Sequence, residues 1–116
     1  MSKGERFLAS LPLKTSFYDR YEKRSYFIAR EVARRILDDP SLLAVGREYL
    51  ERFMRPDPHQ SEHYGLWNQM LRLSPEEIAR RLLEDTERGA LLRDTYPVFV
   101  VLPQEARAEL VEATRA

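Results

Sequence analysis

The sequence contains no cysteine among its 116 residues. A disulfide framework and thiolate chemistry are therefore excluded, and an intracellular setting is permitted. Glycine is scarce as well, because only four glycines occur, at positions 4, 46, 65 and 89. Glycines spaced this widely cannot build a glycine-rich loop that cradles a phosphate group.

Long apolar runs are missing too. The N-terminal stretch MSKGERFLASLPLK has no apolar segment long enough for a signal peptide, and no later segment is long enough to span a bilayer. We therefore expect a cytoplasmic protein. Hydrophobic residues make up 43% and charged residues 33% of the chain, which is typical of a globular protein, and the length indicates one domain.

The chain has no net charge, but its two parts are oppositely charged. From Met1 to Leu37 there are 9 basic and 4 acidic residues, which leaves a charge of +5. The remainder has 10 basic and 15 acidic residues, which leaves −5. The basic segment could lie on the acidic remainder, or it could be directed at a partner molecule.

Helical periodicity dominates the sequence, and we predict an all-α fold: a compact bundle of about five or six mostly short helices. Residues 1–15 are predicted as an irregular N-terminal lead-in and residues 16–116 as a single helical domain. The clearest helix start is the capping box of Ser74, Pro75 and Glu77. The strongest apolar stripe comprises Ile28, Ala29, Val32, Ala33, Ile36 and Leu37.

Prolines and capping residues divide the rest of the chain. An Asp39 cap followed by Pro40 predicts a helix that runs to about Met54. Ser61 predicts the start of a short helix, and further helices are expected after a turn near Asp85 and from Pro103 onward. The residues that the helix after Pro40 should bury are Leu42, Leu43, Tyr49, Leu50, Phe53 and Met54.

One segment differs from its helical surroundings. Residues 98–102 read Val-Phe-Val-Val-Leu between Pro97 and Pro103, a composition that suits a β-strand. A strand needs a partner strand, and we find no second strong candidate. We predict that residues 97–102 form an extended apolar connection between two helices. The alternatives are addition to a sheet edge of another molecule and pairing between two copies in a homodimer.

The stretch HQSEH, from His59 to His63, matches the H-x-x-E-H pattern of one group of zinc peptidases. Two histidines four residues apart share a metal only when both lie on one helix face. Because Pro56 and Pro58 precede the motif and Ser61 resembles a helix cap, His59 should lie outside the helix. We expect no metal site, no catalytic residue and no cofactor.

The basic and aromatic residues of the first long helix are the strongest candidate for a binding surface. Lysine and arginine in a row can contact phosphates or an acidic protein surface, and tyrosine can stack or form hydrogen bonds. The alternative is a solvated face joined by ion pairs such as Glu31 with Arg35. The candidate partner-binding or nucleic-acid-binding residues are Arg20, Lys23, Arg24, Tyr26, Arg30 and Arg34.

Trp67 is the only tryptophan and lies in the apolar stretch GLWNQMLRL. Its helical spacing favours a role as an anchor of the core. A large aromatic side chain at the centre of an interface is the alternative.

The C-terminal half has a tryptophan, then a Thr/Ser-acidic-x-Gly-x-x-Leu-Arg segment, then a Pro-Phe-x-x-Val-Leu stretch. The matching positions are Trp67, Thr86, Glu87, Gly89, Leu92, Arg93, Pro97, Leu102, Glu105 and Arg107. With the basic-aromatic helix and the ILDDP segment at residues 36–40, this pattern resembles small bacterial antitoxin-like proteins that are encoded beside a toxin-like gene. The chain departs from the pattern at Val98, and it lacks the glycine that usually precedes Val-Leu.

The resemblance implies a small helical protein that binds and inhibits a toxin and could also repress its own operon. Tyr96 and Phe99 are candidate interface residues, together with Trp67, because desolvation of aromatic side chains drives the association of proteins. Arg93 could anchor the segment 97–102 by hydrogen bonding to its carbonyl groups. The alternative function is a nucleic-acid-binding transcriptional regulator that uses the basic helix 17–37.

Overall fold

The computed structural model describes residues 1–95 and 102–115, and every regular element in these ranges is helical. The α-helices are α1 (Lys3–Ala9), α2 (Arg20–Asp38), α3 (Leu42–Tyr49), α4 (Ser61–Met70), α5 (Pro75–Leu82), α6 (Glu87–Thr95) and α7 (Gln104–Ala113). The predicted all-α fold is confirmed, and α2 to α7 correspond to the predicted helical segments. None of the helices described has the length and apolar character of a transmembrane span.

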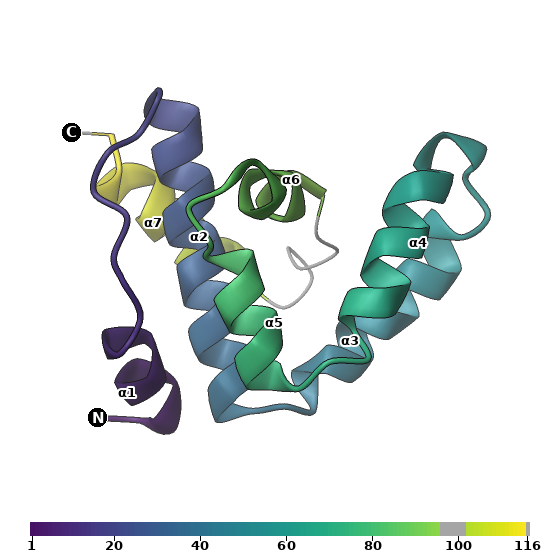
Figure 1. Cartoon of the computed structure of the whole chain (residues 1–116), viewed down its shortest axis with the longest axis horizontal. Coiled ribbons are helices and arrows are strands. Elements are labelled where there is room, and N and C mark those ends of the chain that lie inside the picture. Colours follow the sequence, from purple (N-terminus) through teal and green to yellow (C-terminus); the bar gives the residue numbers. More distant parts are fainter. Residues whose placement is uncertain (96–101, 116) are drawn as a thin grey trace.

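Helix α2 is the central element, because its apolar stripe is wide enough to contact several helices. Helices α1, α5, α6 and α7 all pack against it (Figure 1). Its side chains at Ala29, Val32 and Ala33 are fully buried, and their small size lets the neighbouring helices approach closely. The helix begins at Arg20 because the Asp19 carboxylate accepts a hydrogen bond from the backbone N–H of Glu22 at 2.8 Å.

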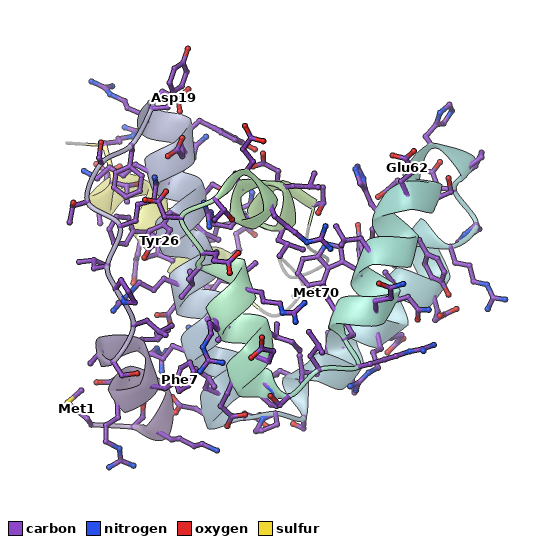
Figure 2. All side chains as sticks on the ribbon, in the orientation of Figure 1. Met1, Phe7, Asp19, Tyr26, Glu62 and Met70 are labelled. Atoms are coloured by element: carbon purple, nitrogen blue, oxygen red, sulfur yellow. The ribbon has the colours of Figure 1, made fainter. Side chains whose placement is uncertain are left out.

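Helix α1 corrects the prediction that residues 1–15 are irregular. The hydroxyl of Ser2 accepts a hydrogen bond from the backbone N–H of Glu5 at 3.1 Å, which caps the helix start. The backbone N–H of Gly4 donates to the Asp38 carboxylate at the end of α2, at 2.7 Å. Figure 2 shows Phe7 on the side of α1 that faces α2. The prediction is therefore wrong for α1, which is docked on α2.

Residues 42–70 form a helical hairpin that stands apart from the other helices in Figure 1. Its first arm is α3 followed by the π-helix η1 (Leu50–Met54), and its second arm is the 3-10 turn η2 (Pro58–Gln60) followed by α4. In η1 the backbone N–H of Arg55 donates to the carbonyl of Leu50 at 2.9 Å. This wider turn leaves Phe53 52% exposed while Leu50 and Met54 are buried, so the predicted burial of Phe53 is wrong.

Candidate interaction surface and cavity

Aromatic and basic side chains gather where α2 begins, and we refer to the exposed Tyr18, Arg20 and Tyr21 and the half-buried Arg24 as the α2 patch. Tyr18 is 91% exposed and Tyr21 56% exposed, the highest values for tyrosine in the described ranges. The guanidinium of Arg24 lies over the Tyr21 ring, 5.7 Å from its centroid. Arg20 and Arg24 form no ion pair with any described residue, and Lys23, on the same turns, is half-buried.

The second half of α2 uses its basic side chains within the fold. Arg34 pairs with Glu31 and, at 3.1 Å, with Asp38, and Arg35 pairs with Glu31 at 3.1 Å. The hydrogen bond from Arg34 is the main reason why the pKa of Glu31 lies below its ordinary value. Arg34 is therefore part of the ion-paired face that was the alternative to a binding surface. Arg30, which is half-buried, has no such pair among the described residues.

The charge difference between the two parts of the chain is partly balanced by long-range ion pairs. Lys3 pairs with Glu76 at 3.2 Å, and Lys14 pairs with Asp85 at 2.7 Å. The hydrogen bond to Asp85 is the main reason why the pKa of Lys14 lies above its ordinary value. The N-terminal lysines thus lie on the acidic remainder, whereas the arginines of the α2 patch remain available for a partner.

Tyr26 was predicted to contact a partner, but the folded chain buries it. Only 1% of Tyr26 is exposed, and its ring packs against Phe17 and Phe27 with centroid distances of 5.6 and 5.3 Å. Its hydroxyl accepts a hydrogen bond from the backbone N–H of Lys14 at 3.2 Å. The prediction is wrong because Tyr26 lies on the face of α2 that the N-terminal segment and α6 cover.

Arg93 is a buried cation that holds the connection between α5 and α6. It is 4% exposed, and its Nη1 donates to the carbonyls of Leu82 and Glu84, each at 2.9 Å. Leu82 ends α5 and Glu84 lies two residues beyond it, and carbonyl groups at the end of a helix have no N–H donor within the helix. Burial lowers the pKa of Arg93 from the ordinary value of arginine. Arg93 was predicted to anchor the segment 97–102, of which residues 97–101 lie outside the described residues.

Thr86 and Gly89 form the turn that positions Arg93. The Thr86 hydroxyl accepts a hydrogen bond from the backbone N–H of Gly89 at 3.0 Å. A Cβ atom at Gly89 would overlap the carbonyl oxygen of Glu84 and would lie 3.0 Å from Nη1 of Arg93. Leu92, which lies between Gly89 and Arg93 in the sequence, is buried. Several positions of the antitoxin-like pattern thus act together to dock α6 against the end of α5.

Trp67 is a core residue that joins the helical hairpin to α6. It is 1% exposed, and its Nε1 donates to the hydroxyl oxygen of Thr95 at 2.9 Å. The Thr95 hydroxyl in turn donates to the carbonyl of Leu91 at 2.8 Å. The core-anchor interpretation therefore fits Trp67. Tyr96 and Phe99, the other predicted aromatic interface residues, lie outside the described residues.

The two histidines of the HQSEH stretch lie on different elements, as the prolines predicted. His59 is exposed in η2, and His63 is half-buried on α4. Within residues 1–95 and 102–115, no group of three or more histidine, aspartate or glutamate side chains is arranged to hold a metal ion.

A cavity of about 500 Å³ lies between α2, the helical hairpin, α6 and α7. The described residues that line it include the three arginines Arg24, Arg93 and Arg107 and one acidic residue, Asp94. The sequence marks Arg24 as part of a basic helix and Arg93 and Arg107 as matches to a pattern. It does not predict that they line one cavity, because each lies on a different helix and only the packing of α2, α6 and α7 places them there.

Comparison of the chain with protein-family models, with curated proteins and with solved structures found no match. What this protein binds must therefore be inferred from the α2 patch, the cavity and the residues around them.

Proposed function

We propose that this chain is a non-catalytic binding protein of the antitoxin type, which binds and inhibits a partner protein encoded beside it in a bacterium and acts in the cytoplasm. The observation that carries the proposal is the α2 patch. Its two tyrosines are more than half exposed, and its two arginines have no ion-pair partner among the described residues.

Tyrosine and arginine are enriched at the energetic centres of protein interfaces, because both combine a large contact area with hydrogen-bonding groups. A tyrosine that is 91% exposed, such as Tyr18, contributes almost nothing to the core of this fold. The side chain therefore retains nearly all of the contact area that it could bury against a partner. The packing of α2 against five other α-helices would hold the patch in place before binding.

The partner surface should be acidic. Arg20 and Arg24 carry positive charges that no described acidic residue neutralises by a direct ion pair. Complementary charges accelerate the encounter of two proteins and select among partners, whereas buried aromatic contacts supply more of the affinity. Binding should therefore become slower, and only moderately weaker, as the salt concentration rises.

The test is to express the chain together with the product of the adjacent reading frame and to measure growth and co-purification. We expect a stoichiometric complex and relief of any growth defect that the neighbour causes alone. The double variant R20E/R24E should weaken this complex at least tenfold, about 1.4 kcal/mol. The matched control is R72E/R88E, which makes the same charge change at two exposed arginines outside the patch.

Two results would overturn the proposal. One is a neighbouring gene product that does not bind the purified chain. The other is an equal loss of binding in R20E/R24E and R72E/R88E, because net charge and not the α2 patch would then explain the interaction.

Nucleic acid is the second candidate partner, because the arginines and tyrosines of the α2 patch also suit phosphate contacts and stacking on bases. The DNA that precedes the gene provides the test. Each phosphate that the patch neutralises should make the slope of log affinity against log salt more negative by about 0.9. DNA binding that R20E/R24E abolishes, without binding of the neighbouring protein, would favour the regulator over the antitoxin.

A further inference from the structure

The cavity between α2, the helical hairpin, α6 and α7 contains a buried positive charge that the described part of the protein does not neutralise directly. Arg93 is 4% exposed and lines this cavity. Its only hydrogen bonds to described residues come from Nη1 and reach neutral carbonyl groups. Glu22, Asp85 and Asp94 attract Arg93 only from beyond ion-pair distance. A guanidinium has five N–H donors, and those of Arg93 that have no described acceptor are open to the cavity, because no fully buried side-chain nitrogen in the described residues lacks a partner.

A buried charge without an opposite charge is costly, and a bound anion is one way to compensate it. The cavity provides two further cations for such an anion. Arg24 lines it from α2 and Arg107 from α7, and neither forms an ion pair with a described residue. Among the charged residues of the lining, three guanidinium groups face a single carboxylate, that of Asp94.

Guanidinium groups match phosphate oxygens particularly well, since their planar N–H donors bind two oxygens at once. The rest of the lining points to what the phosphate would be attached to. Tyr21 and Tyr49 contribute aromatic rings. Gln60, whose Nε2 donates to Asp57 at 3.2 Å, contributes a side-chain carbonyl that can accept a hydrogen bond from the edge of a planar heterocycle. A volume of about 500 Å³ is within the range of small-molecule sites.

We propose that this cavity binds a mononucleotide, with the phosphate group held by Arg24, Arg93 and Arg107 and the base beside Tyr21 and Tyr49. The proposal does not depend on the antitoxin function, because Arg93 and Arg107 both lie outside the α2 patch. Arg24 belongs to both sites, so a bound nucleotide would also change the charge that a partner meets at the patch.

The experiment is a calorimetric titration of the full chain with AMP, GMP, CMP and UMP, and separately with inorganic phosphate and with adenosine. At least one mononucleotide should bind with one-to-one stoichiometry and at least tenfold more tightly than either half-ligand. Arg107→Gln and Arg24→Gln should each weaken this binding about ten- to a hundredfold, as expected for a lost charged hydrogen bond. Arg88→Gln is the matched control, because Arg88 is exposed on α6 and does not line the cavity.

Three outcomes would overturn the proposal: no binding of any mononucleotide, inorganic phosphate binding as tightly as the nucleotides, or nucleotide binding that Arg107→Gln and Arg24→Gln leave unchanged. None of them bears on the neighbouring-protein test, in which Arg107 has no part. Trp67 gives a second readout, because its indole N–H is bonded to Thr95, which lines the cavity. Its fluorescence should change with the same midpoint as the heat signal.

Discussion

The guanidinium of Arg93 lies over the ring of Tyr26, 5.4 Å from its centroid. This contact joins α6 to α2 at the point where Arg93 also donates to the carbonyls of Leu82, at the end of α5, and Glu84, just beyond it. A single side chain thus connects three helices, and stacking on an aromatic face compensates part of the cost of burying its charge.

Replacing Arg93 should reveal how much this connection stabilises the fold. Arg93→Met keeps an unbranched apolar stem but removes the guanidinium, which leaves the carbonyls of Leu82 and Glu84 without their donor. We expect a loss of about 3 kcal/mol in the free energy of unfolding, measured by urea denaturation. Arg93→Lys should lose less, because an ammonium group can still donate to one carbonyl. The exposed Arg88→Met should stay within about 0.5 kcal/mol of the original chain, and an equal loss there would contradict this role.

Gly89→Ala should destabilise the protein, whereas Gly65→Ala should not. The new Cβ at position 89 would overlap the carbonyl oxygen of Glu84, and relieving that overlap must move α6. We expect a cost of about 2 kcal/mol. Gly65 is an exposed residue of α4, and no atom lies within 4 Å of an added Cβ. Alanine there should therefore raise stability by up to about 1 kcal/mol. Thermal unfolding of both variants measures the difference, and changes of the same sign would count against the close packing at position 89.

The hydrogen bond between Trp67 and Thr95 should be measurable as a coupling energy. Trp67→Phe and Thr95→Val each remove it, and each should cost about 1–2 kcal/mol. Because both variants lose the same bond, the double variant should cost less than the sum by about 1 kcal/mol. Chemical denaturation followed by circular dichroism gives all four values. Strict additivity would mean that this bond does not hold the helical hairpin on α6.

The ion pairs of Glu31 should make stability depend on acidic pH. The pKa of Glu31 in the folded chain lies below its ordinary value of 4.5, mainly because Arg34 donates hydrogen bonds to it. The stabilisation is therefore complete above about pH 4.5 and is lost as the pH falls through the lower folded-state pKa. Glu31→Gln should cost up to about 1 kcal/mol at pH 7, since the group is half-buried, and progressively less as the pH falls through the lowered pKa of Glu31.

Glu109→Gln is the control for Glu31→Gln, because Glu109 is exposed and has no ion pair among the described residues. Urea titrations at a series of pH values give the free energy of unfolding as a function of pH. Below about pH 4.5 this free energy should fall less steeply with decreasing pH for Glu31→Gln than for Glu109→Gln. Equal slopes would show that the pairs on α2 do not contribute.

The elements that the sequence predicted are those with strong local signals. The apolar stripe of α2 is long enough to specify a helix alone, and α5 begins at Ser74 as its capping box required, with a hydrogen bond from the backbone N–H of Glu77 at 3.2 Å. Ser2 and Glu5 have the same spacing as Ser74 and Glu77, so the sequence also contains a signal for the start of α1. Seven residues are too few for a stable isolated helix, however, and α1 depends on docking to α2.

Features that depend on residues far apart in the chain could not be predicted from local sequence patterns. The π-turn of η1 exposes Phe53 although the spacing of a regular α-helix would bury it. Tyr26 looked like a surface residue because nothing in its neighbourhood shows that Lys14 and Arg93 cover it. The lining of the cavity is the clearest case, since its arginines meet only after α2, α6 and α7 have packed.

The carbonyl of Glu84 faces both Gly89 and the guanidinium of Arg93, and this arrangement constrains how the protein can evolve. A larger residue at position 89 would push against the oxygen that accepts the hydrogen bond from Arg93. A change at either position should therefore alter how much the other stabilises the fold. In a lineage of such proteins we expect glycine and arginine to be inherited together at this spacing, and to be replaced together when the junction is rebuilt.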